Sequence, residues 1–315
     1  MIKGIHHVTL VVRDLAAAQS YYGAVAGMHR LEAADAAAIA VIDQQLLEPE
    51  GPGFASSLLA GRNGYLLLIA PDWSQGSPEP DANPVNRAGI RHFCVQNHDC
   101  TLLEQAVSVG GGSLIAPPLD LGTGNQYAYA RDGEGNIMEI EGLPYAPVGE
   151  PTWLAHVALV TRDIDRAIEF YAALLETGLK NRGKFGPGPQ LDRMGGFVDA
   201  RIEGAWLPAG NLQLELWQFH EPPSPAERSR PGPFDPGFSR LCLECDDLDA
   251  DAARLVALGG KLRGKSIESR RCRSILASDL EGNAIALLEL RETGATLSIM
   301  ALADPEICAR VEAGR

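Results

Sequence analysis

The strongest constraint on this chain is an internal repeat. The segment AHVALVTRDIDRAIEFY at residues 155–171 aligns without a gap on HHVTLVVRDLAAAQSYY at residues 6–22. Towards the end of each half, RDGEGNIMEIEGL at 131–143 corresponds to SDLEGNAIALLEL at 278–290. Each copy of a repeat folds as the same structural unit, so the repeat has to be settled before other fold questions. The pattern indicates that the chain consists of two halves with the same fold.

Each half divides again into two units. The run IHHVTLVV at residues 5–12 is rich in β-branched residues and predicts a strand, and the residues after it turn the chain into a helix. A second such strand, IRHFCV at 90–95, opens the next unit, whose helix of about 101–109 is ended by three glycines. The sequence therefore predicts four units, each of one strand, one helix and three further strands.

Pro- and Gly-rich segments mark the boundaries between these units. They comprise the connector 71–84, the linker 142–152 and the loop 221–237. The linker is the best domain boundary, so we expect a first domain at 1–145 and a second at 152–292. Residues 293–315 form a C-terminal tail outside the repeat, with a helix expected at 304–311.

Composition narrows the classes of function. The 315 residues suffice for two domains with real cores, and 45% hydrophobic with 22% charged residues is ordinary for soluble globular proteins. A net charge of −14 argues against nucleic acid or an anionic membrane as partner. No apolar run approaches a membrane span, and the first residues lead straight into a strand. We expect a cytoplasmic protein that takes a small-molecule substrate as a monomer or homodimer.

The cysteines do not suggest a disulfide framework in so long a chain. There are six, at positions 94, 100, 242, 245, 272 and 308. Cys242 and Cys245 have C-x-x-C spacing, but they lie in a strand-like run, where residues three apart face opposite ways. The two therefore cannot share one metal ion and are expected to be core residues.

Two glutamates lie on polar faces of otherwise apolar strands. In the strand after Asn136, alternation puts Met138 and Ile140 on one face and Glu139 on the other. In LQLELW at 212–217 the leucines share one face, while Glu215 lies on the other with polar and aromatic neighbours. A carboxylate on the concave face of a sheet is well placed to bind a metal ion or to accept a proton.

Four such units, with a histidine in the first strand and D-x-x-G-N-x-x-E closing the first half, resemble the vicinal oxygen chelate superfamily. This superfamily includes glyoxalase I, methylmalonyl-CoA epimerase, fosfomycin-resistance proteins, extradiol dioxygenases and bleomycin-binding proteins. The resemblance covers residues 4–290. It implies an α+β fold in which four βαβββ modules form two curved, mostly antiparallel sheets with helices on the convex faces. It specifies the fold far better than the reaction, because this fold hosts several chemistries.

The resemblance also implies two metal-ligand positions in each unit, one in its first strand and one in its last. In chain order the pairs are His7 and Leu67, His92 and Glu139, His156 and Glu215, and Arg240 and Ala286. The spacing within a pair is nearly equal in units one and three, and again in units two and four. This regularity supports the assignment of these eight positions, here called the register. Four further histidines lie off it and are assigned no role: His6, His29, His98 and His220.

The lost ligands are concentrated in units one and four. If each half formed its own site, the first would keep His7, His92 and Glu139 and the second only two ligands. If the units cross over, as in glyoxalase I, unit two meets unit three. One site is then complete, with His92, Glu139, His156 and Glu215, and no metal is expected near His7 and Arg240. Crossed pairing needs fewer coincidences, so it is preferred.

Two imidazoles and two carboxylates suit one divalent ion such as Zn, Ni, Co or Mn. The resemblance to glyoxalase I implies a metal-dependent lyase or isomerase that transfers a proton on the carbon next to a carbonyl, through a metal-stabilised enediolate or enolate. Glu139 or Glu215 would be the base that accepts this proton. The sequence does not choose between the two glutamates. Each histidine is expected to donate its other ring nitrogen to a nearby acceptor.

Two other functions stay open at the level of sequence. The first is an Fe(II) extradiol-type ring-cleaving dioxygenase that uses His7, His92 and Glu139. The second is a non-catalytic small-molecule-binding protein of the resistance type. In each case Trp217, Phe219 and the loop 221–237 suggest an apolar pocket with a mobile rim.

Overall fold

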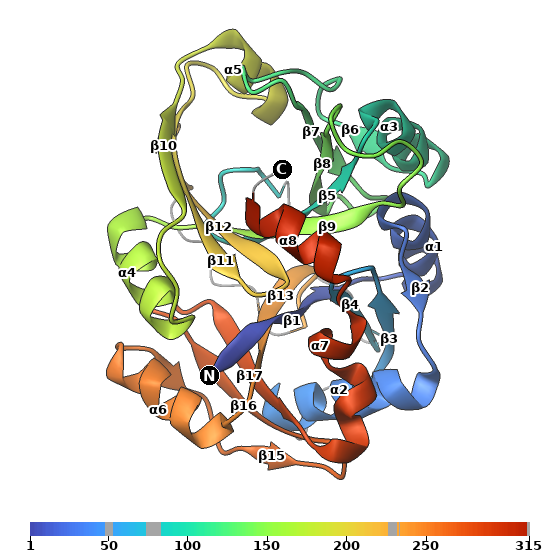
Figure 1. The fold of residues 1–315 in the computed structure, drawn as a ribbon, viewed down its shortest axis with the longest axis vertical. Coiled ribbons are helices and arrows are strands. Elements are labelled where there is room, and N and C mark those ends of the chain that lie inside the picture. Colours follow the sequence, from blue (N-terminus) through green and yellow to red (C-terminus); the bar gives the residue numbers. More distant parts are fainter. Residues whose placement is uncertain (48–52, 74–82, 226–231, 233, 314–315) are drawn as a thin grey trace.

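The computed structural model consists of two curved sheets flanked by helices (Figure 1). It describes residues 1–47, 53–73, 83–225, 232 and 234–313. The connector 71–84 and the loop 221–237 therefore lie partly outside the described residues, and the mobile rim predicted for the loop is untested. Within the described ranges, no helix has the length and apolar character needed to cross a membrane.

Units one and four together form one sheet, here called the outer-unit sheet. Its strand order is β14-β16-β17-β13-β1-β4-β3-β2, with β15 paired to β16. The strands are β1 (Ile2–Val11), β2 (His29–Arg30), β3 (Phe54–Ala60), β4 (Tyr65–Pro71), β13 (Gly237–Cys245), β14 (Lys261–Leu262), β15 (Ile267–Glu268), β16 (Cys272–Ser278) and β17 (Ala284–Leu290).

Units two and three form the second sheet, here called the inner-unit sheet. Its strand order is β10-β11-β12-β9-β5-β8-β7-β6. The strands are β5 (Gly89–Asn97), β6 (Ser113–Leu114), β7 (Gln126–Arg131), β8 (Ile137–Gly142), β9 (Trp153–Val160), β10 (Asn181–Phe185), β11 (Arg201–Ala209) and β12 (Leu212–Glu221).

The pairing of strands confirms the predicted fold class. In each unit the first and last strands are parallel neighbours, as β5 and β8 are, and the remaining neighbours are antiparallel. The units meet through their first strands, β1 with β13 and β5 with β9, both antiparallel. Each sheet thus takes one unit from each half of the chain, and the predicted pairing of unit two with unit three is confirmed.

One helix follows the first strand of each unit and packs on the convex face. These helices are α1 (Leu15–Ala26), α3 (Cys100–Val109), α4 (Ile164–Leu174) and α6 (Leu248–Ala257). Their buried residues join Met138 and Ile140 in one continuous apolar core. Each helix begins after an aspartate whose carboxylate accepts a backbone N–H of the first turn, as Asp14 does from Ala17 at 2.9 Å. The aspartate repeated in the sequence is therefore a helix N-cap.

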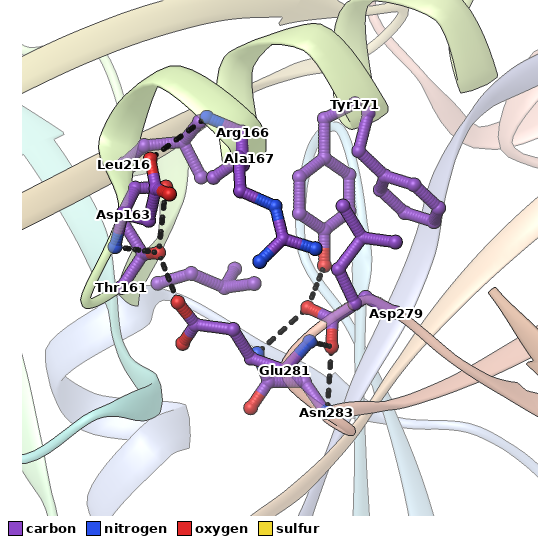
Figure 2. Close-up of a pocket in the computed structure, with 12 residues that line it drawn as sticks. Thr161, Asp163, Arg166, Ala167, Tyr171, Leu216, Asp279, Glu281 and Asn283 are labelled. Carbon is purple, nitrogen blue, oxygen red and sulfur yellow. Dashed lines mark hydrogen bonds between the residues drawn. The ribbon is translucent and has the colours of Figure 1, made fainter. Parts of the chain in front are cut away.

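The repeated D-x-E-G-N turn joins the two units of each half. Tyr171 of α4 donates its hydroxyl to Asp279 at 2.8 Å, and Glu281 accepts a hydrogen bond from Thr161 at 2.6 Å (Figure 2). Tyr22 of α1 donates to Asp132 in the same way, at 2.8 Å. The small hollow drawn in Figure 2 lies at this junction, and the hydrogen bonds around it explain why the turn occurs in both halves.

Additional elements fill the concave face of the outer-unit sheet. They are the helix α2 (Ala33–Leu47), inserted between β2 and β3, and the tail elements η1 (Glu292–Leu297) and α7 (Ile299–Leu302). The last tail element, α8 (Pro305–Ala313), packs instead on β9 and β12 of the inner-unit sheet, where Ile307 and Val311 join Trp153 in an apolar cluster. Residues of α2, η1 and α7 join residues of this face in an apolar cluster that contains Leu67 and Ala286. The helix predicted at 304–311 is confirmed as α8, whereas α2 was not anticipated.

Candidate metal centre

The four residues selected by the register lie on the central strands of the inner-unit sheet: His92 on β5, Glu139 on β8, His156 on β9 and Glu215 on β12. Ala158 on β9 is the cross-strand neighbour of both His92 and Glu215, so these side chains share one face. His156 lies two residues before Ala158 and points the same way because strand side chains alternate. The strands therefore direct all four side chains to one point on the concave face.

The side chains converge closely. Each of the four offers a ligand atom, and these atoms all lie within 4.8 Å of one another. The Nε2 atom of His156 is 3.0 Å from Oε2 of Glu139 and 3.1 Å from Oε2 of Glu215. The Nε2 atom of His92 is 3.4 Å and 3.6 Å from the same two oxygens. The two rings lie 5.6 Å apart between centroids, so the histidines of units two and three are close enough to share one ion.

Burial and mutual charge shift the pKa values in this cluster. Burial alone would raise the pKa of Glu139, but the hydrogen bond from His156 and the nearby imidazole of His92 hold it below its ordinary value. Burial would likewise raise the pKa of Glu215, but the charge of His156 holds the pKa of this carboxyl well below its ordinary value. Burial would lower the pKa of His156, yet the two carboxylates raise it well above 6.5. The cluster therefore holds two carboxylates around a protonated imidazole, and a divalent cation can take the place of that proton.

The donor set also fits a cation because of the atoms left unsatisfied. Within the described residues, Nε2 of His92 and Oε2 of Glu215 are buried and make the ion-pair contacts given above, but neither atom takes part in a hydrogen bond. Buried polar atoms are rarely left so, and a coordinated ion would satisfy both. The expected acceptor for the second ring nitrogen is missing for His92, whose Nδ1 has no partner among the described residues. The predicted acceptor for this histidine is therefore not among the described protein groups, and the prediction stays untested.

Two profiles that describe the Glyoxalase/Bleomycin resistance protein/Dioxygenase superfamily match residues 4–140 and 155–274. The chain belongs to this superfamily. Among solved structures, glyoxalase I from Zea mays matches with a TM-score of 0.64 at 19% identity, over 91% of this chain and 92% of that chain. A proposed dioxygenase from Bacillus subtilis matches with a TM-score of 0.59 at 12% identity, over 100% and 96% of the two chains. These likenesses show the fold that the superfamily shares.

One curated relative is similar in sequence. It is the "Anthracycline biosynthesis protein DauV" of Streptomyces sp. (strain C5), which is 26% identical over 208 residues. The similarity covers 62% of this chain and 64% of the relative, so the chain spans less than two thirds of the relative's length.

One of the candidate ligands, Glu215, is held by a tryptophan that the sequence analysis did not identify. Trp206 on β11 donates its indole N–H to Oε1 of Glu215 at 2.8 Å. The two residues are cross-strand neighbours on paired strands. Contacts of this kind orient metal-binding carboxylates, and here Trp206 holds one oxygen of Glu215 in place. A polar partner on the neighbouring strand could have been sought at this position once the hairpin of β11 and β12 had been recognised.

A second buried carboxylate lies beside the cluster. Glu141 follows Glu139 on the same face of β8 and accepts hydrogen bonds from Gln96 at 2.6 Å and Asn125 at 2.8 Å. Burial, and next the charge of Glu139, raise the pKa of Glu141 to about 7. The side chain of Gln96 in turn accepts the indole N–H of Trp153 at 2.8 Å. This polar network forms one flank of the candidate metal centre.

Apolar and aromatic residues form the other flank. Trp217 and Phe219 belong to this wall, as the sequence predicted, and helix α5 (Pro189–Gly195) contributes Met194. The ring of Trp217 lies 5.5 Å from that of Phe185 on β10. Beside the wall is a cavity of ≈ 450 Å³, lined by Pro84, Val85, Ser113, Leu114, Ile115, Arg131, Gly195, Gly196 and Phe197. The face is thus polar at one end and apolar at the other.

The corresponding positions of the outer-unit sheet do not form this site. Leu67 and Ala286 are buried in the apolar cluster under α2, and neither supplies a ligand atom. His7 lies on β1 of this sheet, whereas His92 and Glu139 lie on the other. The triad His7, His92 and Glu139, considered for an Fe(II) dioxygenase, is therefore not assembled, because the first strands of units one and two belong to different sheets.

Proposed function

We propose that this superfamily member is a metal-dependent lyase or isomerase of the glyoxalase or epimerase type. The observation that carries the proposal is the convergence of two imidazoles and two buried carboxylates, His92, Glu139, His156 and Glu215, on one point. A divalent ion such as Zn, Ni, Co or Mn, held by these residues, would supply a Lewis acid for adjacent oxygens of a substrate. One glutamate would then move the proton next to the carbonyl.

The surroundings of the two glutamates support different roles. Glu215 is held at Oε1 by Trp206, so it suits a fixed ligand. Among the described residues, Glu139 has hydrogen-bond and ion-pair contacts only with the two imidazoles. Its carboxylate is freer to turn towards a substrate while His92 and His156 stay in place. We therefore assign proton transfer to Glu139 and metal coordination to Glu215.

The walls of the site favour a substrate with an aromatic or otherwise apolar part. Trp206, Trp217 and Phe185 pack together, with 5.5 Å between the ring centroids of the two tryptophans. The curated relative is named for anthracycline biosynthesis, which is compatible with an aromatic substrate. The polar end, with Glu141 and Asn125, would face the oxygens of the substrate rather than its apolar part.

The test compares Glu139→Gln with Glu215→Gln. A panel of α-hydroxy carbonyl and dicarbonyl compounds is incubated with metal-loaded protein in D₂O, and exchange of the carbon-bound proton is followed by NMR. We expect Glu139→Gln to keep its bound metal and to lose exchange by about 10²-fold or more, the usual contribution of a positioned acid or base. Glu215→Gln should mainly lower metal affinity.

Two results would count against this proposal. Equal loss of metal in both variants would refute the division of roles between the two glutamates. Oxygen uptake with catechols and Fe(II), without proton exchange on any compound of the panel, would replace the lyase or isomerase with a ring-cleaving dioxygenase. That enzyme would draw its two histidines and one carboxylate from the same cluster.

A further inference from the structure

A second group of potential ligands lies in the outer-unit sheet, away from the register positions of units two and three. His6, His7 and Cys242 each offer a ligand atom, these atoms lie within 4.8 Å of one another, and all three residues are buried. His7 occupies a register position, but His6 and Cys242 do not. The prediction of no metal near His7 considered only register positions, so it did not weigh this group.

An irregularity in β1 brings the two histidines together. Along β1 the pairing with β13 passes from Ile5, opposite Leu243, to His7, opposite Cys242, so His6 is an extra residue. In a regular strand His6 and His7 would point to opposite faces. At this bulge their Nδ1 atoms lie 2.7 Å apart instead. The aligned residue in unit three is Ala155, so the second imidazole is peculiar to unit one.

The hydrogen bonds around His6 fix which of its ring nitrogens can bind a metal. Its Nε2 lies 2.9 Å from the carbonyl oxygen of Leu297 in η1. A carbonyl can only accept, so Nε2 carries the proton and Nδ1 presents its lone pair. Metal-binding histidines are typically held in this way by a backbone carbonyl. The ring of His6 also stacks on Tyr65, with 4.8 Å between centroids, which fixes its plane.

His7 supplies a second observation. Its Nε2 is buried and has no hydrogen-bond partner in the part of the chain that the structure describes. A contact between the two Nδ1 atoms alone therefore leaves the group incompletely satisfied. Cys242, directly across the strand pair, adds a soft donor.

We propose that His6, His7 and Cys242 bind a second metal ion, a thiophilic one such as copper(I) or zinc. Thiolate and imidazole ligands select such ions over magnesium, calcium and manganese. Binding would release the thiol proton of Cys242, whereas the proton that His7 Nδ1 donates to His6 would move to Nε2 of His7, so that both Nδ1 atoms could bind the ion as neutral imidazoles. The three donors are buried, so the ion would not meet a substrate and would have a structural role. Three donors suit copper(I), whereas a structural zinc ion would need a fourth ligand.

The ion would tie the tail to the sheet. Cys242 lies on β13, the histidines lie on β1, and His6 holds η1 through Leu297. The next tail element is anchored nearby, because the carboxylate of Glu244 accepts the Ser298 hydroxyl at 2.5 Å and the Ile299 N–H at 2.9 Å. Metal at this place would thus stabilise the junction between the repeat and the tail.

Cobalt(II) distinguishes the two candidate centres by spectroscopy. A cobalt–thiolate bond absorbs in the near ultraviolet, and the cluster of His92, Glu139, His156 and Glu215 contains no sulfur. The full chain is freed of metal, titrated with Co(II), and then challenged with Cu(I) and with Zn(II). We expect a thiolate-to-cobalt band equivalent to one site per chain, which either ion removes, and about two bound metal ions per chain by elemental analysis.

Cys242→Ser should abolish the band and lower the metal content by one equivalent, with a circular dichroism spectrum like that of the unaltered protein. Cys94→Ser is the matched control, because Cys94 is a buried thiol of the inner-unit sheet near Glu141. It should keep the band. Absence of the band from the unaltered protein at saturating Co(II) would overturn the proposal, and so would a band lost in Cys94→Ser but kept in Cys242→Ser.

Discussion

The contact between Trp206 and Glu215 allows a sharp test of the candidate metal centre. Trp206→Phe keeps an aromatic ring on β11 but removes the indole N–H that Glu215 accepts at 2.8 Å. Without this donor, Oε1 of a buried carboxylate loses its partner, and the carboxylate can rotate away from the position that faces the two imidazoles.

The expected magnitude follows from the role of such partners. Loss of a hydrogen bond that orients a metal ligand usually lowers metal affinity by about 10- to 100-fold. At about 1.4 kcal/mol for each factor of ten, this corresponds to roughly 1.4–2.8 kcal/mol of binding free energy. The geometry of Trp206 and Glu215 is good, so we expect Trp206→Phe to lie within this range.

Trp217→Phe is the matched control. Trp217 is a neighbour of Trp206 in the same aromatic wall, with 5.5 Å between ring centroids. Its Nε1 has no hydrogen-bond partner within the described residues. Affinities for Zn(II) or Co(II) are measured by competition with a chromophoric chelator. Equal affinities in the two variants would refute the positioning role of Trp206.

Two further predictions concern stability and pH. Tyr22→Phe removes a buried hydrogen bond to Asp132 and should lower the free energy of unfolding, measured in urea, by about 1.5–3 kcal/mol. Within the described residues the hydroxyl of Tyr21 donates only to the thioether of Met138, at 3.4 Å, so Tyr21→Phe should change this free energy far less. Equal losses in the two variants would contradict the explanation. Burial raises the pKa of Glu141 from 4.5 to about 7, so the folded state favours the protonated carboxyl. The metal-free protein should therefore lose about 3 kcal/mol of its free energy of unfolding as the pH rises from about 4.5 to about 7. Glu141→Gln should show a smaller difference between its unfolding free energies at pH 5 and pH 8 than the unaltered protein, and an undiminished difference would remove Glu141 as the cause.

Several features of this protein follow from local pattern and spacing. The repeat establishes four units, and strand alternation places Glu139 and Glu215 on the faces away from the helices. The clustering of lost ligands in units one and four indicates which units meet, before any contact between them is known. The tail helix at 304–311 is also evident from the sequence. All these inferences use residues that are near in sequence, or a register that the repeat transfers from one copy to the other.

Tertiary structure decided what surrounds those positions. Trp206 reaches Glu215 only because β11 and β12 pair in one register, and Glu141 meets Asn125 only because of the path of the preceding loop. The bulge in β1 turns His6 towards His7 and Cys242, against the alternation that its sequence implies. Contacts of this kind depend on strand register, bulges and loop paths, which are set by the packing of the whole sheet. A local sequence pattern contains the donors and acceptors but not the distances between them.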